Sequence, residues 1–78
     1  MSYYVLVYNR QLGQLVRGPE SFPDESRRDA LRRRFELEKA YPGLEVVVLG
    51  GESEAAIRRT HGRYFKSISE LLVTGSGG

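Results

Sequence analysis

The chain has 78 residues, which is enough for one domain and too few for two. It contains no cysteine and one histidine, so disulfides, cysteine-based metal sites and histidine-rich zinc sites are excluded. The formal net charge of +2, from 12 Lys and Arg residues against 10 Asp and Glu residues, does not by itself require a nucleic-acid partner.

No apolar run approaches the roughly 20 residues that span a bilayer, and the N-terminus lacks the pattern of a signal peptide. Together with the absence of cysteine, these observations predict a cytoplasmic protein. We expect a single domain over residues 1–74, followed by a flexible Gly/Ser tail over residues 75–78 that is typical of an artificial linker.

The first predicted strand covers residues 3–8, where aromatic and β-branched residues dominate. Both of its faces are apolar, which is typical of a central strand. Residues 9–13 predict a hairpin loop. The returning strand covers residues 14–17 and ends at Gly18-Pro19.

A helix is predicted next. Asp24 or Ser26 can cap its N-terminus, and the helix runs to about Ala40, where Pro42-Gly43 stops it. Its many charged residues are of both signs, which indicates a solvated outer surface. Helical spacing predicts a buried arc made of Ala30, Leu31, Phe35, Leu37 and Tyr41.

The third predicted strand covers residues 44–49 and ends at Gly50-Gly51. This glycine pair lacks the spacing of a phosphate-binding loop, so we interpret it as a turn. Ser53 can cap a second helix, which is expected to break near Lys66. The apolar stripe of this helix consists of Ile57, His61, Tyr64, Ile68 and Leu72.

This order predicts an α+β fold, a two-layer ββαβα domain. The three-stranded sheet has the order 2-1-3, with the third strand beside the first and parallel to the second. Both helices are expected on one face of the sheet.

A sheet with helices on one side leaves its other face bare, and a large apolar patch usually marks an interaction site. We therefore expect a homodimer or another protein partner at this face, and a function by protein–protein contact. One alternative is that residues 68–73 fold over the face, and another is that the face is formed by Tyr3, Val5 and Val7 instead. The preferred interface residues are Tyr4, Leu6, Tyr8, Val47 and Leu49.

The second helix has a local excess of positive charge, which is the best nucleic-acid signal in the chain. Basic residues also favour helix C-termini because of the helix dipole, so the pattern has a structural explanation as well. The candidate nucleic-acid contacts are Arg58, Arg59, Arg63 and Lys66.

No catalytic constellation is visible, and we expect neither enzymatic activity nor a cofactor. His61 is a candidate general base, but its place on an apolar stripe favours a structural role. The ββαβ order and the terminal Gly77-Gly78 pair resemble ubiquitin-like carriers. That resemblance implies a C-terminal glycine activated for transfer, although the predicted second helix stands where that fold has its last strand.

Overall fold

The structure is a computed structural model that describes residues 1–65. It confirms an α+β fold with a three-stranded sheet in the order β2-β1-β3. The central strand β1 is antiparallel to both neighbours, so β2 and β3 run in the same direction. The elements are β1 (Ser2–Asn9), β2 (Gln14–Pro23), a 3-10 turn η1 (Asp24–Ser26), α1 (Arg27–Ala40), β3 (Glu45–Gly51), α2 (Glu54–Thr60) and a second 3-10 turn η2 (Gly62–Tyr64).

The central strand β1 is buried on both faces, as its composition predicts. Val5, Leu6 and Val7 have no solvent exposure. Because side chains alternate along a strand, Val5 and Val7 point to one face of the sheet, and Leu6 points to the other with Tyr4 and Tyr8.

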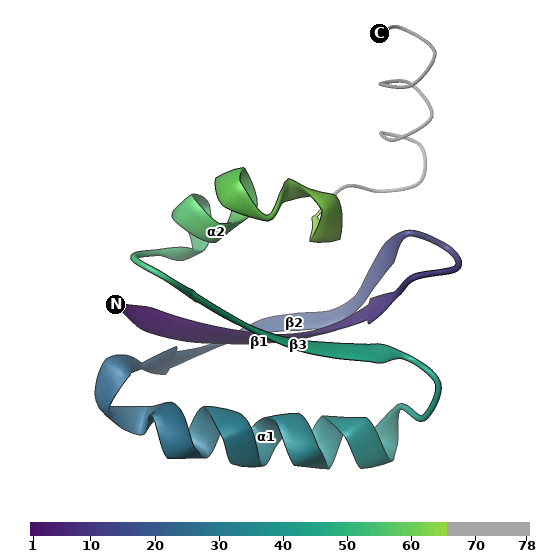
Figure 1. Cartoon of the computed structure of the whole chain (residues 1–78), viewed down its shortest axis with the longest axis horizontal. Coiled ribbons are helices and arrows are strands. Elements are labelled where there is room, and N and C mark those ends of the chain that lie inside the picture. Colours follow the sequence, from purple (N-terminus) through teal and green to yellow (C-terminus); the bar gives the residue numbers. More distant parts are fainter. Residues whose placement is uncertain (66–78) are drawn as a thin grey trace, which may run out of the picture.

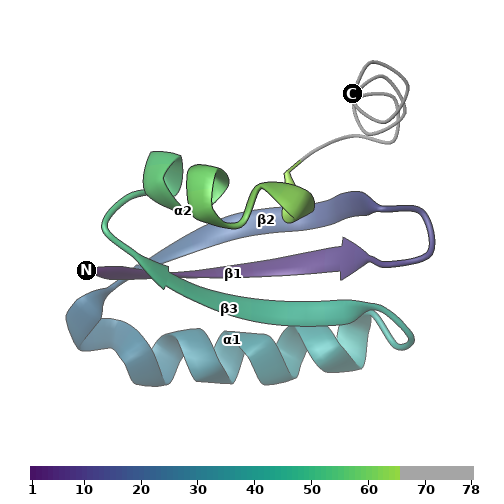
Figure 2. The same cartoon turned by 45° about the horizontal axis from the view of Figure 1, so that its top comes forward.

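The two helices lie on opposite faces of the sheet, which corrects the prediction of one helical layer (Figures 1 and 2). Ala30 and Leu37 of α1 pack on the face of Val5 and Val7. Ile57 of α2 packs on the other face. The physical reason lies in β1 itself, since a strand that is apolar on both sides needs cover on both sides.

Strand β2 is longer than predicted, because it continues through Gly18-Pro19 to Pro23. Its pairing with β1 shifts register on either side of Val7, and this irregularity accommodates the extra residues. Gly18 has a φ of 93°, and a Cβ atom there would lie 2.7 Å from the carbonyl oxygen of Val5. Only glycine fits this close approach, so Gly18 bends the strand without ending it.

Helix α1 ends at Ala40 as predicted, but its buried face is narrower than the predicted arc. Ala30 and Leu37 are buried and Tyr41 is partly buried. Leu31 and Phe35 are 39% and 65% exposed. The side chains of α1 and its C-cap that face the sheet are those at positions 30, 33, 37 and 41, as the helical repeat requires. Leu31 and Phe35 therefore lie on the outer surface of the helix.

Helix α2 is shorter than predicted and ends at Thr60, before the expected break. The Ser53 hydroxyl accepts a hydrogen bond from the backbone N–H of Ala56, so Ser53 is its N-cap as predicted. The other predicted positions of its stripe, Ile68 and Leu72, lie outside the described residues, as does the 75–78 tail. No helix in residues 1–65 combines the length and the apolar composition needed to cross a bilayer.

The glycine pair Gly50-Gly51 belongs to the end of β3, whereas the sequence indicated a turn after the strand. A Cβ atom on Gly51 would lie 2.5 Å from the Cγ2 atom of Ile57. The missing side chain thus lets α2 approach the sheet closely enough for Ile57 to be buried.

Candidate interaction surfaces

The face predicted as an open interface is the core beneath α2. Leu6 is fully buried, and Tyr4, Tyr8 and Leu49 are nearly so, while Val47 is partly buried against them. Ile57, Tyr64 and Phe65 provide the cover. The five predicted interface residues lie together, but the chain itself covers them, so the premise of a bare sheet face is wrong.

Two tyrosines hold the η2 turn against this core. The rings of Tyr8 and Tyr64 meet edge to face, with centroids 4.9 Å apart and planes at 84°. The Tyr64 hydroxyl donates a hydrogen bond of 3.2 Å to the Glu45 carboxylate. Burial and the negative charge of Glu45 raise the pKa of the Tyr64 hydroxyl, so it stays a neutral donor at physiological pH.

Three of the predicted nucleic-acid contacts, Arg58, Arg59 and Arg63, are exposed, and two of these have partners within the chain. Arg58 pairs with Glu54 at 3.4 Å, and its guanidinium lies 4.6 Å from the centre of the Phe65 ring. Arg63 lies 4.9 Å from the centre of the Tyr64 ring. Arg59 is exposed and forms no ion pair with residues 1–65, and Lys66 lies outside the described residues. The arginines therefore cover the aromatic side of the α2 layer as well as facing solvent.

His61 lies at the C-cap of α2 and is partly buried. Its backbone N–H donates to the carbonyl oxygen of Ile57. Within residues 1–65 its imidazole makes no hydrogen bond, and no group of three potential metal ligands occurs. A general base needs an orienting partner, and the described residues place none beside His61. The Gly77-Gly78 pair of the ubiquitin-like resemblance lies outside the described residues.

Strand β3 forms an edge of the sheet, and this edge is apolar. Within residues 1–65, its only neighbour is β1. No backbone hydrogen bond within residues 1–65 joins β3 to any segment besides β1. Every second residue of an edge strand directs its N–H and C=O groups outward. Val46, Val47 and Val48 are partly exposed along this edge, with no charge, proline or bulge among them.

Strand β2 forms the opposite edge and differs in each of these respects. Its middle contains Pro19, which has no N–H to offer a neighbouring strand, and the irregular Gly18. Arg17 and Glu20 add charge on either side of them. These are the features with which natural sheets block unwanted strand pairing. The two edges of this sheet are therefore chemically unequal.

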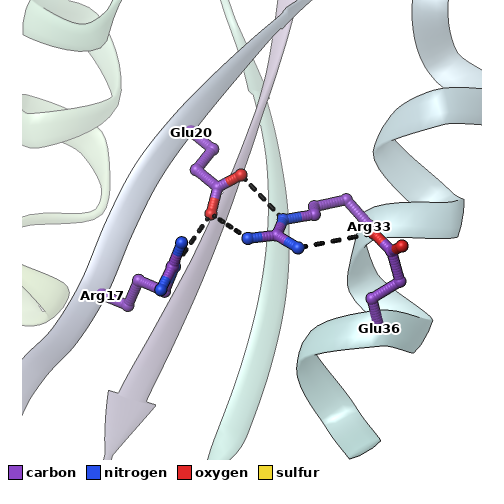
Figure 3. Close-up of polar contacts among 4 residues, drawn as sticks. All are labelled: Arg17, Glu20, Arg33 and Glu36. Atoms are coloured by element: carbon purple, nitrogen blue, oxygen red, sulfur yellow. Dashed lines mark hydrogen bonds and ion pairs between the residues drawn. The ribbon is translucent and has the colours of Figure 1, made fainter. Parts of the chain in front are cut away.

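An ion-pair cluster joins β2 to one flank of α1 (Figure 3). Two nitrogen atoms of Arg33 donate to the two carboxylate oxygens of Glu20 at 2.8 and 3.2 Å. Glu20 also accepts from Arg17, and Arg33 also contacts Glu36. The hydrogen bonds from Arg33 lower the pKa of Glu20, against the opposing effect of partial burial.

The ion pair of Arg33 also shows which way the rest of α1 faces. Arg33 and Glu36 lie on the flank above β2. With 3.6 residues per turn, the opposite flank is the one above β3. This surface, which we call the α1 flank, consists of Arg27, Leu31, Arg34, Glu38 and the adjoining Phe35.

Family models, curated proteins and solved structures yield no match to this chain. The surfaces themselves are therefore the basis for a functional interpretation. Sequence reasoning placed Leu31 and Phe35 in the core and treated β3 only as part of a sheet face. The available signal was the uninterrupted Val46–Leu49 run in a strand that the order 2-1-3 places at an edge.

Proposed function

We propose that the protein is a small non-enzymatic interaction protein of the cytoplasm that acts through protein–protein contact as a homodimer. In this proposal β3 pairs in antiparallel orientation with β3 of a second copy. The two three-stranded sheets then join edge to edge. The interface is the edge of the sheet, and the face formed by Tyr4, Leu6 and Tyr8 remains under α2.

The observation that carries the proposal is the contrast between the two edges. A flat apolar edge strand is a template for pairing with another chain, and proteins normally protect such edges. Here β2 contains Pro19 and flanking charges, whereas β3 presents Val46, Val47 and Val48, and within residues 1–65 its backbone groups bond only to β1. Strand addition would satisfy those groups and cover the valines in one step.

The sequence of β3 suits pairing with itself. A two-fold axis perpendicular to the sheet keeps each side chain on its own face, and opposite residues of an antiparallel pair share a face. The axis therefore passes between one residue and the same residue of the second copy. An axis at Val48 pairs all seven residues of the strand. Val47 then lies opposite Leu49 of the second copy, and Glu45 lies opposite Gly51, so no like charges meet.

Nucleic-acid contact through the second helix has weaker support from the structure. Arg58 and Arg63 already lie over aromatic rings, and Arg58 is paired with Glu54. To bind a phosphate, these arginines would have to give up such contacts, and this reduces the net binding free energy that each phosphate contributes. Among the described candidates, Arg59 alone has neither an ion pair nor an aromatic ring as a partner within residues 1–65.

Sedimentation velocity of the full chain, from low to high micromolar concentration, tests the proposal. We expect a monomer–dimer equilibrium for the wild type. Val47→Lys introduces a charge in the middle of the edge, as natural edge strands do, and should shift the equilibrium to monomer. A wild type that stays monomeric at the highest concentration would contradict the proposal.

The matched control is Val16→Lys on the protected strand β2. Val16 is 45% exposed, and its substitution should leave the dimer intact. Circular dichroism and dispersed amide spectra show whether each variant is folded. If Val47→Lys does not fold, hydrogen exchange of the wild type decides, because pairing protects the outward amides of β3 as well as those bonded to β1. Outward amides that exchange freely at high concentration would contradict the proposal.

A further inference from the structure

We propose that the α1 flank is the second half of the same interface, so that a second copy of this chain contacts both β3 and α1. The inference rests on the proposed pairing of β3. It adds a specific contact between helices, with Leu31 and Phe35 at its centre. These are the two large apolar side chains of α1 that the sequence places in a core and the chain leaves exposed.

The geometry of the monomer places the flank beside the open edge. Helix α1 packs over β1 and β3 on the face that contains Val46 and Val48. Figure 2 shows the helix running alongside β3 beneath the sheet. Because Arg33 is tied to Glu20 on β2, the helix cannot rotate Leu31 away from the β3 side without losing that pair. The apolar edge of β3 and the α1 flank are therefore neighbours.

Edge pairing of β3 would bring the two α1 helices side by side. An axis perpendicular to the sheet keeps both helices on the same face and makes them antiparallel. Helix α1 runs opposite to β3, from the Gly51 end of the strand to the Glu45 end. An axis beside Val48, in the middle of β3, thus passes beside the middle of α1. In that arrangement Leu31 faces the Leu31–Phe35 region of the second copy.

The charges of the flank favour this antiparallel contact. Arg27 lies at its beginning and Glu38 at its end. Arg27 forms no ion pair with residues 1–65, whereas Glu38 pairs with Arg34 at 2.8 Å. An antiparallel second copy brings Glu38 opposite Arg27 at both ends of the contact, while a parallel copy would put like charges together. The apolar centre of the flank, Leu31 and Phe35, lies beside the self-complementary strand β3. A second copy uses both features, whereas an acidic partner of another kind would not need them to lie together.

The test compares the double variant Leu31→Glu, Phe35→Glu with the wild type by sedimentation equilibrium of the full chain. We expect the dissociation constant of the dimer to rise at least about tenfold, because both side chains would be covered in the dimer. The matched control is Leu12→Glu in the hairpin loop. Leu12 is 52% exposed and lies away from the flank, so its variant should dimerise like the wild type.

Cross-linking gives a second readout that does not depend on the energetics of the apolar pair. The chain has no cysteine, so a single cysteine can be introduced cleanly. Arg34→Cys lies on the flank near the axis and should be joined to its copy by a short bis-maleimide reagent. Arg32→Cys, on the outward side of the same helix, should not be joined.

The outcomes separate this inference from the proposed function. Loss of affinity in the double variant, with cross-linking at position 34 only, supports the helix contact. A dimer that is broken by Val47→Lys but unaffected by the double variant would overturn the helix contact and leave the edge pairing in place. A wild type that never dimerises would overturn both.

Discussion

The charged side chain of Glu20 links strand β2 to helix α1. Its carboxylate holds Arg33 of α1 and Arg17 of β2 at once. Glu20→Gln keeps the shape of the side chain but replaces these charged contacts with weaker ones. We expect a lower free energy of unfolding at neutral pH, measured by urea denaturation.

The pH dependence of this effect follows from the lowered pKa of Glu20 in the folded chain. A lowered pKa means that the unfolded chain binds the proton more readily. The stabilisation is therefore complete above the pKa that Glu20 has in the unfolded chain. It is lost as the pH falls through the lower pKa that Glu20 has in the folded chain. The difference between wild type and Glu20→Gln should vanish at strongly acidic pH. A constant difference would contradict the assignment, and Glu52→Gln, which alters a carboxylate without an ion pair in residues 1–65, serves as the control.

Single residues also explain why the predicted buried arc of α1 was too wide. Helical spacing alone admits Leu31 and Phe35 to the buried arc, and nothing in the sequence shows that Arg33 occupies part of that arc through Glu20. Glu20 is 13 positions away in the chain. Such a long-range ion pair can narrow the buried face of a helix without any local signal.

At the scale of elements, the two helices differ in how they begin. Ser53 caps α2 through its hydroxyl, whereas Ser26 at the start of α1 makes no such hydrogen bond. Ser53→Ala should therefore lower the free energy of unfolding by about 1 kcal/mol. Ser26→Ala should change it by much less. Equal losses in urea denaturation would show that the Ser53 hydrogen bond does not stabilise α2.

The order and pairing of the strands were more predictable than the placement of the helices. The dense apolar run in β1 and the run in β3 specified a central strand and its neighbour, and the hairpin specified β2. The face of the sheet on which α2 packs was not predictable, because Ile57 is the only buried residue among the seven residues of this helix. Its face was decided by the turn after Gly51 and by the aromatic residues that follow it, Tyr64 and Phe65.

At the scale of the whole molecule, a small domain has a limited margin of stability, and dimerisation would add to it. Thermal unfolding should then depend on concentration. Each tenfold increase in chain concentration adds about 1.4 kcal/mol per mole of dimer to the free energy of unfolding. We expect Tm to rise with concentration for the wild type and to stay constant for Val47→Lys. A constant Tm for both would contradict a stabilising dimer.

The candidate site itself was predictable only in part. The sequence indicated more apolar strand surface than one helical layer can hide, and that excess is real. Its location was wrong, because α2 and η2 close the face that contains Tyr4 and Leu6. Among residues 1–65, the apolar surface that lies together on the β3 side is the edge of β3 and the outer pair Leu31 and Phe35. A surface of this kind depends on tertiary arrangement, which composition and periodicity do not specify.

The irregular middle of β2 also has a consequence for the size of any assembly. If two copies join through β3, the outermost strands on both sides are β2, and each presents Gly18-Pro19 with Arg17 and Glu20 beside it. A third copy finds no regular row of donors and acceptors there. Two copies could therefore join their sheets through β3, but further copies could not add to the β2 edges to form a fibre.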